Sequence, residues 1–168
     1  RGNQIGYSID EFLEFFHQAL SIASIDYLAI ASWGHDVFRN KIRAKGPHQG
    51  ELVNAVIYKA LKGKVAVIAS GGINSQEKAL EALEHADLVG LSTPFITDPE
   101  FAVKIKEGKA EEIQLSIKPE NLEELAIPQA AFKDIVPLMD FGESLHKDAR
   151  DFFRSLEANY KERAVDEN

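Results

Sequence analysis

Two successive strand-then-helix units are predicted by the stretch VAVIASGGINSQEKALEALEHADLVGLSTPFITDPEF, Val65–Phe101. The first unit opens with a short apolar, β-branched run at Val65–Ala69, and Gly71-Gly72 interrupts this run. Asn74 then starts a helix, and Glu77 stands three residues further on, at the position of a capping-box partner. A buried strand, a glycine turn and a helix therefore follow one another in the first half of the stretch.

The second unit repeats this order with different residues at the end of the strand. Its apolar run is Ala86–Leu91, and the run ends in Ser92-Thr93-Pro94. Asp98 is the predicted N-cap of the next helix, and Pro99 occupies the first helical position, where its missing N–H costs nothing. The sequence therefore predicts α/β architecture with at least two parallel strands.

Both strand ends suit the binding of a phosphate group. A glycine pair allows backbone to approach a ligand closely, and a helix N-terminus directs free N–H groups and a positive dipole end towards it. Two such ends side by side are typical of the phosphate site after strands seven and eight of a (β/α)8 barrel. The plainer alternative is that Gly71-Gly72 only makes a tight turn between strand and helix.

The sequence of this segment resembles that of one family, the old yellow enzymes, which are FMN-dependent NAD(P)H oxidoreductases. Members show a strand ending in GGI, an acidic strand of the ADLV type, and a Gly-Arg-Pro-type turn before an Asn/Asp-Pro helix start. The corresponding residues here are Gly71-Gly72-Ile73, Ala86-Asp87-Leu88-Val89 and Pro94–Pro99. The resemblance covers about Tyr7–Gly108, and Ile25–Ser32 is similar to the sixth barrel strand of the family.

The resemblance implies the C-terminal half of a (β/α)8 TIM barrel, with strands six to eight and their helices, and FMN as the cofactor. It assigns the FMN phosphate to the backbone of Gly71 and Gly72 and, at the second strand end, to Ser92 and Thr93. The family usually has Gly-Arg where this chain has Ser92-Thr93, so the cation that pairs with the phosphate is missing. The family's residues for substrate oxygens and for flavin N1 match nothing in this chain, so no catalytic residue is predicted.

Length and composition limit what the chain can form. Its 168 residues amount to one domain with room for a core, but a complete barrel takes roughly 250 residues. We therefore expect the C-terminal part of a longer polypeptide that is inactive by itself. Residues 1–110 are expected to form the half-barrel, and residues 111–168 a helical extension packed on it.

Charge and cysteine content exclude several classes of protein. The net charge of −8 disfavours a nucleic-acid partner, and the absence of cysteine excludes disulfides, thiolate chemistry and cysteine-based zinc sites. The adjacent pair His35-Asp36 does not have metal-ligand spacing, and no metal site is predicted. No apolar run approaches the roughly 20 residues that span a bilayer. We expect a cytoplasmic protein without a membrane or nucleic-acid partner.

Upstream of this stretch, the pattern predicts a helix, a strand, a loop and a second helix. The helix starts at the capping box Ser8–Glu11, and Tyr27–Ala31 is predicted to be a parallel strand covered on both faces. Trp33–Gly50 has no clear period and is predicted to be a long loop, followed by a helix at Glu51–Leu61. Loops at this end of barrel strands usually carry the chemistry.

Trp33 and His35 are candidates for a substrate pocket, because they follow the sixth strand at the end where a barrel binds its ligands. The alternative is that Trp33 packs beneath the long loop and His35 is solvated. Neither residue has a sequence partner that decides between these two interpretations.

The function predicted from these observations is FMN-dependent transfer of hydride from NAD(P)H to a small, electron-poor acceptor, with this chain supplying the phosphate end of the flavin site. A homo-oligomer is also expected. One alternative is a half-barrel that has lost flavin and serves as a binding or structural module, which the absence of the arginine favours. Another is a different phosphate-binding barrel, such as an isomerase or aldolase, but this alternative does not explain the sequence of Pro94–Pro99.

Overall fold

The computed structural model describes residues 6–31, 36–117, 121–128, 131, 151 and 155. These residues form two compact units. Within the described residues, the first unit contains residues 6–31, Asp36–Ile73 and Glu77–Gly90, and the second contains Asn74–Gln76 and the residues from Leu91 onward. Most of the predicted extension at 111–168 lies outside the described residues, so the predicted boundary at residue 110 stays a prediction.

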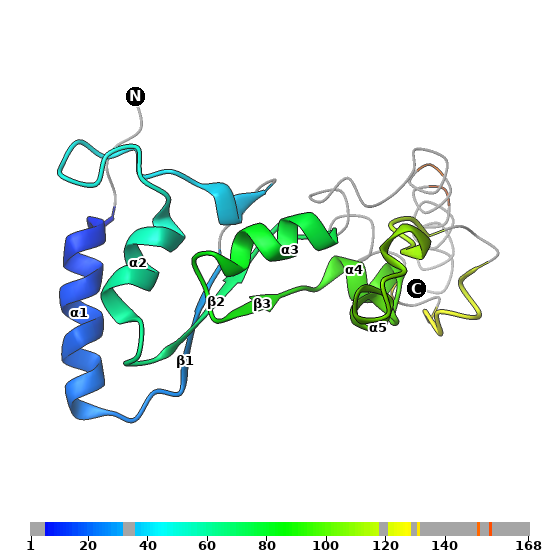
Figure 1. Cartoon of the computed structure of the whole chain (residues 1–168), viewed down its shortest axis with the longest axis horizontal. Coiled ribbons are helices and arrows are strands. Elements are labelled where there is room, and N and C mark those ends of the chain that lie inside the picture. Colours follow the sequence, from blue (N-terminus) through cyan, green and yellow to red (C-terminus); the bar gives the residue numbers. More distant parts are fainter. Residues whose placement is uncertain are drawn as a thin grey trace, which may run out of the picture. The chain divides into compact units, whose positions relative to one another are not determined.

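A three-stranded parallel sheet forms the centre of the first unit (Figure 1). The strands are β1 (Tyr27–Ile30), β2 (Ala66–Ser70) and β3 (Leu88–Gly90), and they lie in the order β1-β2-β3. Tyr27 is paired with Ala66 in the first ladder, and Ile68 with Leu88 in the second. The predicted α/β class and the parallel strands are therefore confirmed, and a sheet of this kind is compatible with part of a barrel.

Three α-helices of the first unit begin close to the predicted positions, and a short 3-10 helix lies within the segment predicted to be a loop. They are α1 (Ile9–Ile22), η1 (Val37–Arg39), α2 (Val53–Leu61) and α3 (Gln76–Leu83). The capping box is confirmed, because the Ser8 hydroxyl accepts from the Glu11 N–H at 3.2 Å and the Glu11 carboxylate accepts from the Ser8 N–H at 2.7 Å. α2 begins two residues after the predicted start at Glu51, and α3 begins two residues after Asn74.

The two faces of the sheet differ in how well they are covered. Residues in register point to the same face, so Leu28 and Ile30 share a face with Val67 and Ala69, which are both fully buried. On the other face, Tyr27 is 59% exposed and Leu88 is 53% exposed. The prediction that the first strand is covered on both faces is therefore wrong for this chain.

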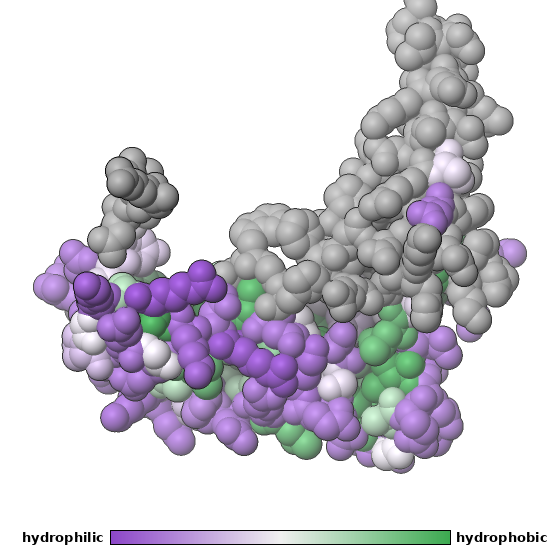
Figure 2. All heavy atoms as spheres, turned by 90° about the horizontal axis from the view of Figure 1, so that it is seen from above, coloured by the Kyte–Doolittle hydropathy of each residue, from purple (hydrophilic) through white to green (hydrophobic). Residues whose placement is uncertain are grey.

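Apolar side chains from the helices and β2 make up the core of the first unit, while others remain at the surface. The buried residues are Phe16, Val37, Phe38, Val56, Ile57, Leu61, Val65, Val67, Ala69, Ile73, Ala82 and Ala86. Figure 2 shows hydrophobic residues exposed among hydrophilic ones, and the large exposed apolar residues of this unit include Tyr7, Phe15, Ile22, Tyr27, Leu80 and Leu88. None of the described helices has both the length and the apolar character that a membrane span requires.

The second unit begins with two short helices where one was predicted. These are α4 (Thr93–Thr97) and α5 (Phe101–Lys106), followed by the 3-10 turn η2 (Ala110–Glu112). The predicted helix start at Asp98 and Pro99 is wrong, since α5 begins at Phe101. The Asp98 carboxylate accepts from the Glu100 N–H, and the Asp98 carbonyl accepts from the Phe101 N–H, so Asp98 holds the turn that precedes α5.

Candidate functional site

The turn after β2 requires glycine at two successive positions. Gly71 has φ of 97° and Gly72 has φ of 82°, a region that residues with a side chain rarely adopt. At Gly72 there is also no room for a side chain, because an added Cβ would lie 2.7 Å from the Asp36 Cα and 2.9 Å from the Asp36 Oδ1. The backbone of the segment after β1 therefore lies directly against the predicted phosphate-binding turn.

Both carbonyl groups of this turn accept hydrogen bonds. The Gly71 oxygen accepts from the Phe38 N–H at 3.4 Å, and the Gly72 oxygen accepts from the Lys78 Nζ at 3.3 Å. By contrast, the N–H groups of Gly72 and Ile73 donate no hydrogen bond within the described part of the chain. Both carbonyl oxygens of the turn are thus hydrogen-bonded, whereas the N–H groups of Gly72 and Ile73 have no acceptor among the described residues.

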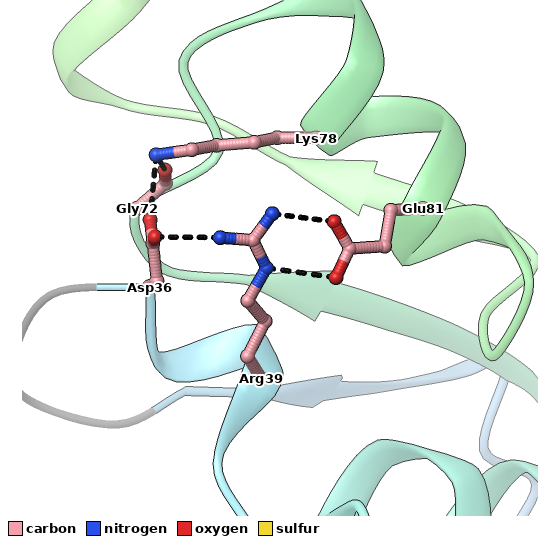
Figure 3. A network of polar contacts seen from close by, with 5 residues as sticks. All are labelled: Asp36, Arg39, Gly72, Lys78 and Glu81. Carbon is pink, nitrogen blue, oxygen red and sulfur yellow. Dashed lines mark hydrogen bonds and ion pairs between the residues drawn. The ribbon is translucent and has the colours of Figure 1, made fainter.

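Four charged side chains next to the turn form a continuous network, which we call the turn clamp: Asp36, Arg39, Lys78 and Glu81 (Figure 3). Arg39 binds Glu81 through two parallel bonds, of 2.7 Å at Nε and 2.5 Å at Nη2. Asp36 accepts from Arg39 at 2.9 Å and from Lys78 at 2.7 Å. The clamp therefore joins η1, the residue before it, α3 and the Gly72 carbonyl.

The charges of the turn clamp compensate one another. The hydrogen bonds that Arg39 donates to Glu81 raise the pKa of Arg39 and lower the pKa of Glu81. The four side chains are between 25% and 44% exposed, so solvent screens these pairs and they contribute little to stability. Two cations and two carboxylates leave no net formal charge beside the turn.

Ser92 and Thr93, the residues predicted for the second strand end, open the second unit. Ser92 precedes α4 and makes no side-chain capping bond, although its carbonyl accepts from the N–H groups of Phe95 and Ile96 at 3.1 and 3.3 Å. Thr93 is the first residue of α4 and is half-buried. Gly71 and Gly72 belong to the other unit, so a single anion site formed by both strand ends stays a prediction.

The other predicted site residues were Trp33 and His35, and both lie outside the described residues. Their place in a substrate pocket therefore also stays a prediction. Within the described residues, no group of three or more His, Asp or Glu side chains is arranged to hold a metal ion.

Sequence reasoning missed the turn clamp. The spacing Asp36-Arg39 and the spacing Lys78-Glu81 are each ordinary for neighbours on a helical turn. The decisive contacts join residues 42 positions apart, Asp36 to Lys78 and Arg39 to Glu81. No local pattern reports such pairs. The only available signal was that a loop with mixed charges follows the strand beside a glycine turn.

A second carboxylate organises the segment after α4, and it is largely buried. Asp98 is 3% exposed, and its Oδ2 accepts from the Lys104 Nζ at 2.6 Å and from the Gln114 N–H at 2.8 Å. Its Oδ1 accepts from the Glu100 N–H at 3.1 Å. Burial raises the pKa of Asp98, but the bonds from Lys104 and the two N–H groups outweigh burial, so the pKa is lowered overall. The contacts of Asp98 indicate a structural role.

No protein-family model matches the chain. An "Uncharacterized oxidoreductase" from Streptococcus pyogenes serotype M5 (strain Manfredo) is 62% identical over 162 residues, which are 96% of this chain and 41% of that protein. A "Probable NADH-dependent flavin oxidoreductase" from Bacillus subtilis (strain 168) is 30% identical over 119 residues, 70% of this chain and 31% of that protein. The chain thus spans about two fifths of the first relative and about a third of the second. Both names support an oxidoreductase.

Proposed function

We propose that the whole protein is an FMN-dependent oxidoreductase of the old yellow enzyme type, and that this chain supplies the phosphate end of its flavin site. The single observation that carries the proposal is the Gly71-Gly72 turn, where the carbonyl groups are occupied and the N–H groups of Gly72 and Ile73 have no described acceptor. The name of the Bacillus subtilis relative, which includes NADH and flavin, supports a flavin cofactor.

The chemistry of this turn fits a phosphate. Phosphate oxygens accept hydrogen bonds from backbone N–H groups, and successive N–H groups in a left-handed turn can form a concave anion site. The absence of side chains at Gly71 and Gly72 allows the close approach that such bonds need. In the proposed site, these N–H groups bind and orient the phosphate, and α3 presents its N-terminal dipole end.

Ser92 and Thr93 are the proposed second half of the same phosphate site. A Thr hydroxyl makes one neutral hydrogen bond, whereas the arginine usual in the family makes two charge-assisted bonds. We therefore propose weaker binding of the phosphate at this end than in relatives with arginine. Arg43 and Lys45 are the loop cations that could compensate, and both side chains are exposed.

The proposed reaction of the whole protein takes hydride from NAD(P)H and passes it to a small, electron-poor acceptor. Bound FMN would supply the redox chemistry, and the residues of this chain would hold its phosphate. Trp33 and His35 are the proposed contributors to the substrate pocket. The uncovered sheet face with Tyr27 and Leu88, and strands β1 and β3 that each pair on one side only in the described sheet, support completion of a TIM barrel by further strands. A cytoplasmic homo-oligomer completes the proposal.

The absorption spectrum of the whole purified protein tests the proposal. Oxidised flavin absorbs at about 450 nm, and chromatography of the released cofactor distinguishes FMN from FAD and riboflavin. We expect FMN, and bleaching of the band when NADH or NADPH is added without oxygen. A protein that remains colourless after incubation with excess FMN would contradict the proposal.

One observation favours a second candidate, a flavin-free binding or structural module. The turn clamp has no net formal charge, and Thr93 replaces the family's arginine, so the described residues of the site carry little positive charge for a phosphate dianion. The same spectrum separates the two candidates. A module without flavin would bind neither FMN nor NADH, while retaining a folded thermal transition.

A further inference from the structure

We infer that Lys78 is a positioning residue of the proposed phosphate site: its bond to the Gly72 carbonyl turns the adjacent N–H group towards the anion. This inference rests on the proposed function. It assigns a role to a residue that lies outside the predicted motif and acts through the backbone. The two peptide bonds concerned are Gly71–Gly72 and Gly72–Ile73.

A trans peptide is planar, and its C=O and N–H point in opposite directions. No cis peptide occurs among the described residues. The Lys78 bond holds the Gly72 carbonyl and therefore directs the N–H of Ile73 away from Lys78. The Phe38 bond holds the Gly71 carbonyl and in the same way directs the N–H of Gly72 away from η1. The two unused donors of the turn thus owe their direction to these contacts.

External contacts are needed because glycine does not fix its own peptide orientation. With no Cβ, Gly71 and Gly72 can adopt positive or negative φ at similar cost, so either peptide can rotate. At 3.4 and 3.3 Å the two bonds to the turn are long and individually weak. Their donors must therefore be held in place by something stronger.

The turn clamp provides that support on both sides. Asp36 holds the Lys78 ammonium at 2.7 Å, and Arg39 holds Asp36 at 2.9 Å and also binds Glu81 on α3 (Figure 3). Phe38, which is buried, lies next to Arg39 in η1, so the same ion pairs fix the backbone donor to Gly71. The clamp orients peptide dipoles instead of adding net charge, which agrees with its balanced formal charge.

Lys78→Met in the whole protein tests this role, with the binding of FMN compared with that of riboflavin. Riboflavin lacks the phosphate, so the ratio of the two affinities isolates the phosphate contacts. Met keeps the length of the side chain and its helix propensity but cannot donate to the Gly72 carbonyl. We expect the ratio to fall by about tenfold, because the misdirected Ile73 N–H would no longer donate a hydrogen bond to the charged phosphate. Lys78→Arg, which can still donate, should restore most of it.

Lys59→Met is the matched control, because Lys59 is an exposed lysine on α2. It should leave the ratio unchanged, and the melting temperature of each variant checks folding. A Lys78→Met protein with an unchanged ratio, or with equal losses of both affinities, would overturn the positioning role while the proposed function stands. Wild-type protein that binds neither flavin, or both equally, would overturn the proposed phosphate site and this inference together.

Discussion

Two aspartates, Asp36 and Asp98, each organise a segment that follows a strand, but they do so in opposite surroundings. Asp36 is about one-third exposed and binds two cations, which connect it to the glycine turn and to α3. Asp98 is almost fully buried and binds one cation and two backbone N–H groups. Each belongs to a different compact unit.

The two aspartates are expected to differ in what they contribute, one to the stability of the fold and the other to the orientation of the glycine turn. A buried carboxylate that loses a partner leaves an uncompensated group in a low dielectric, whereas an exposed one is solvated by water. Asp98 should therefore matter mainly to the free energy of unfolding. The clamp around Asp36 should matter mainly to the direction of the turn's N–H groups, and only slightly to stability.

The largest effect is expected from Asp98→Asn. The new amide keeps the shape, but its NH2 group faces either Lys104 and the Gln114 N–H or, in the flipped orientation, the Glu100 N–H, so donors meet in both cases. Breaking a buried ion pair in this way should lower the free energy of unfolding by about 3 kcal/mol, measured by urea denaturation. The ratio of FMN to riboflavin affinity should not change. If Asp98→Asn changed this affinity ratio but left the free energy of unfolding unchanged, Asp98 would be a positioning residue and the expected role would be wrong.

Acid provides a second test of Asp98. Its pKa is lowered in the folded state, so its contribution to stability is present above the ordinary value of 3.8 and is lost as the pH falls below that value towards the folded-state pKa. The difference in unfolding free energy between wild type and Asp98→Asn should therefore be constant near neutral pH and shrink below about pH 4. A difference that persists in strong acid would show that shape, not charge, explains the loss.

Gly72→Ala should produce the second largest effect. The positive φ and the contact with the Asp36 backbone should together cost about 2 kcal/mol, and the displaced turn should bind FMN poorly. Gly63→Ala is the matched control, because Gly63 has a similar φ of 78° but nothing within 4 Å of an added Cβ. If the two variants lose the same stability, the contact with Asp36 does not constrain the turn.

Thr93→Arg tests the strand end in the second unit. A guanidinium at this position should tighten FMN binding by roughly tenfold, because a charge-assisted bond replaces a neutral one. Titration by quenching of flavin fluorescence measures the change, and riboflavin binding serves as the control that should not respond. An unchanged FMN affinity would show that Ser92-Thr93 does not belong to the phosphate site. The proposed site would then consist of the Gly71-Gly72 turn without these residues.

The smallest stability effect is expected for Arg39→Gln. Arg39 and Glu81 are both more than two-fifths exposed, so water can replace their bonds. We expect the melting temperature to change by less than about 2 °C, as for an ordinary surface substitution. Calorimetry measures the melting temperature. A decrease as large as that of Asp98→Asn would show that the turn clamp, like Asp98, contributes substantially to the stability of the fold.

Local features of this chain were largely predictable from its sequence. The capping box at Ser8 and Glu11 depends on hydrogen bonds between residues three apart, so the pattern contains the whole interaction. The parallel strands follow from short apolar runs separated by helices, and the glycine turn follows from two adjacent residues with no side chain. The tested helix starts were less accurate, and Asp98 shows why: its partners Lys104 and Gln114 come from further along the chain.

By itself, then, the sequence determined the α/β class, the three strands and the position of the Gly71-Gly72 turn, because these depend on periodicity and on local backbone freedom. Only the tertiary structure decided which way the peptides of that turn face. Asp36 and Lys78 are separated by 42 residues, and packing of η1 and α3 beside β2 brings them within 2.7 Å. The uncovered sheet face was likewise decided by packing, since a strand's apolar residues do not specify how many layers cover it.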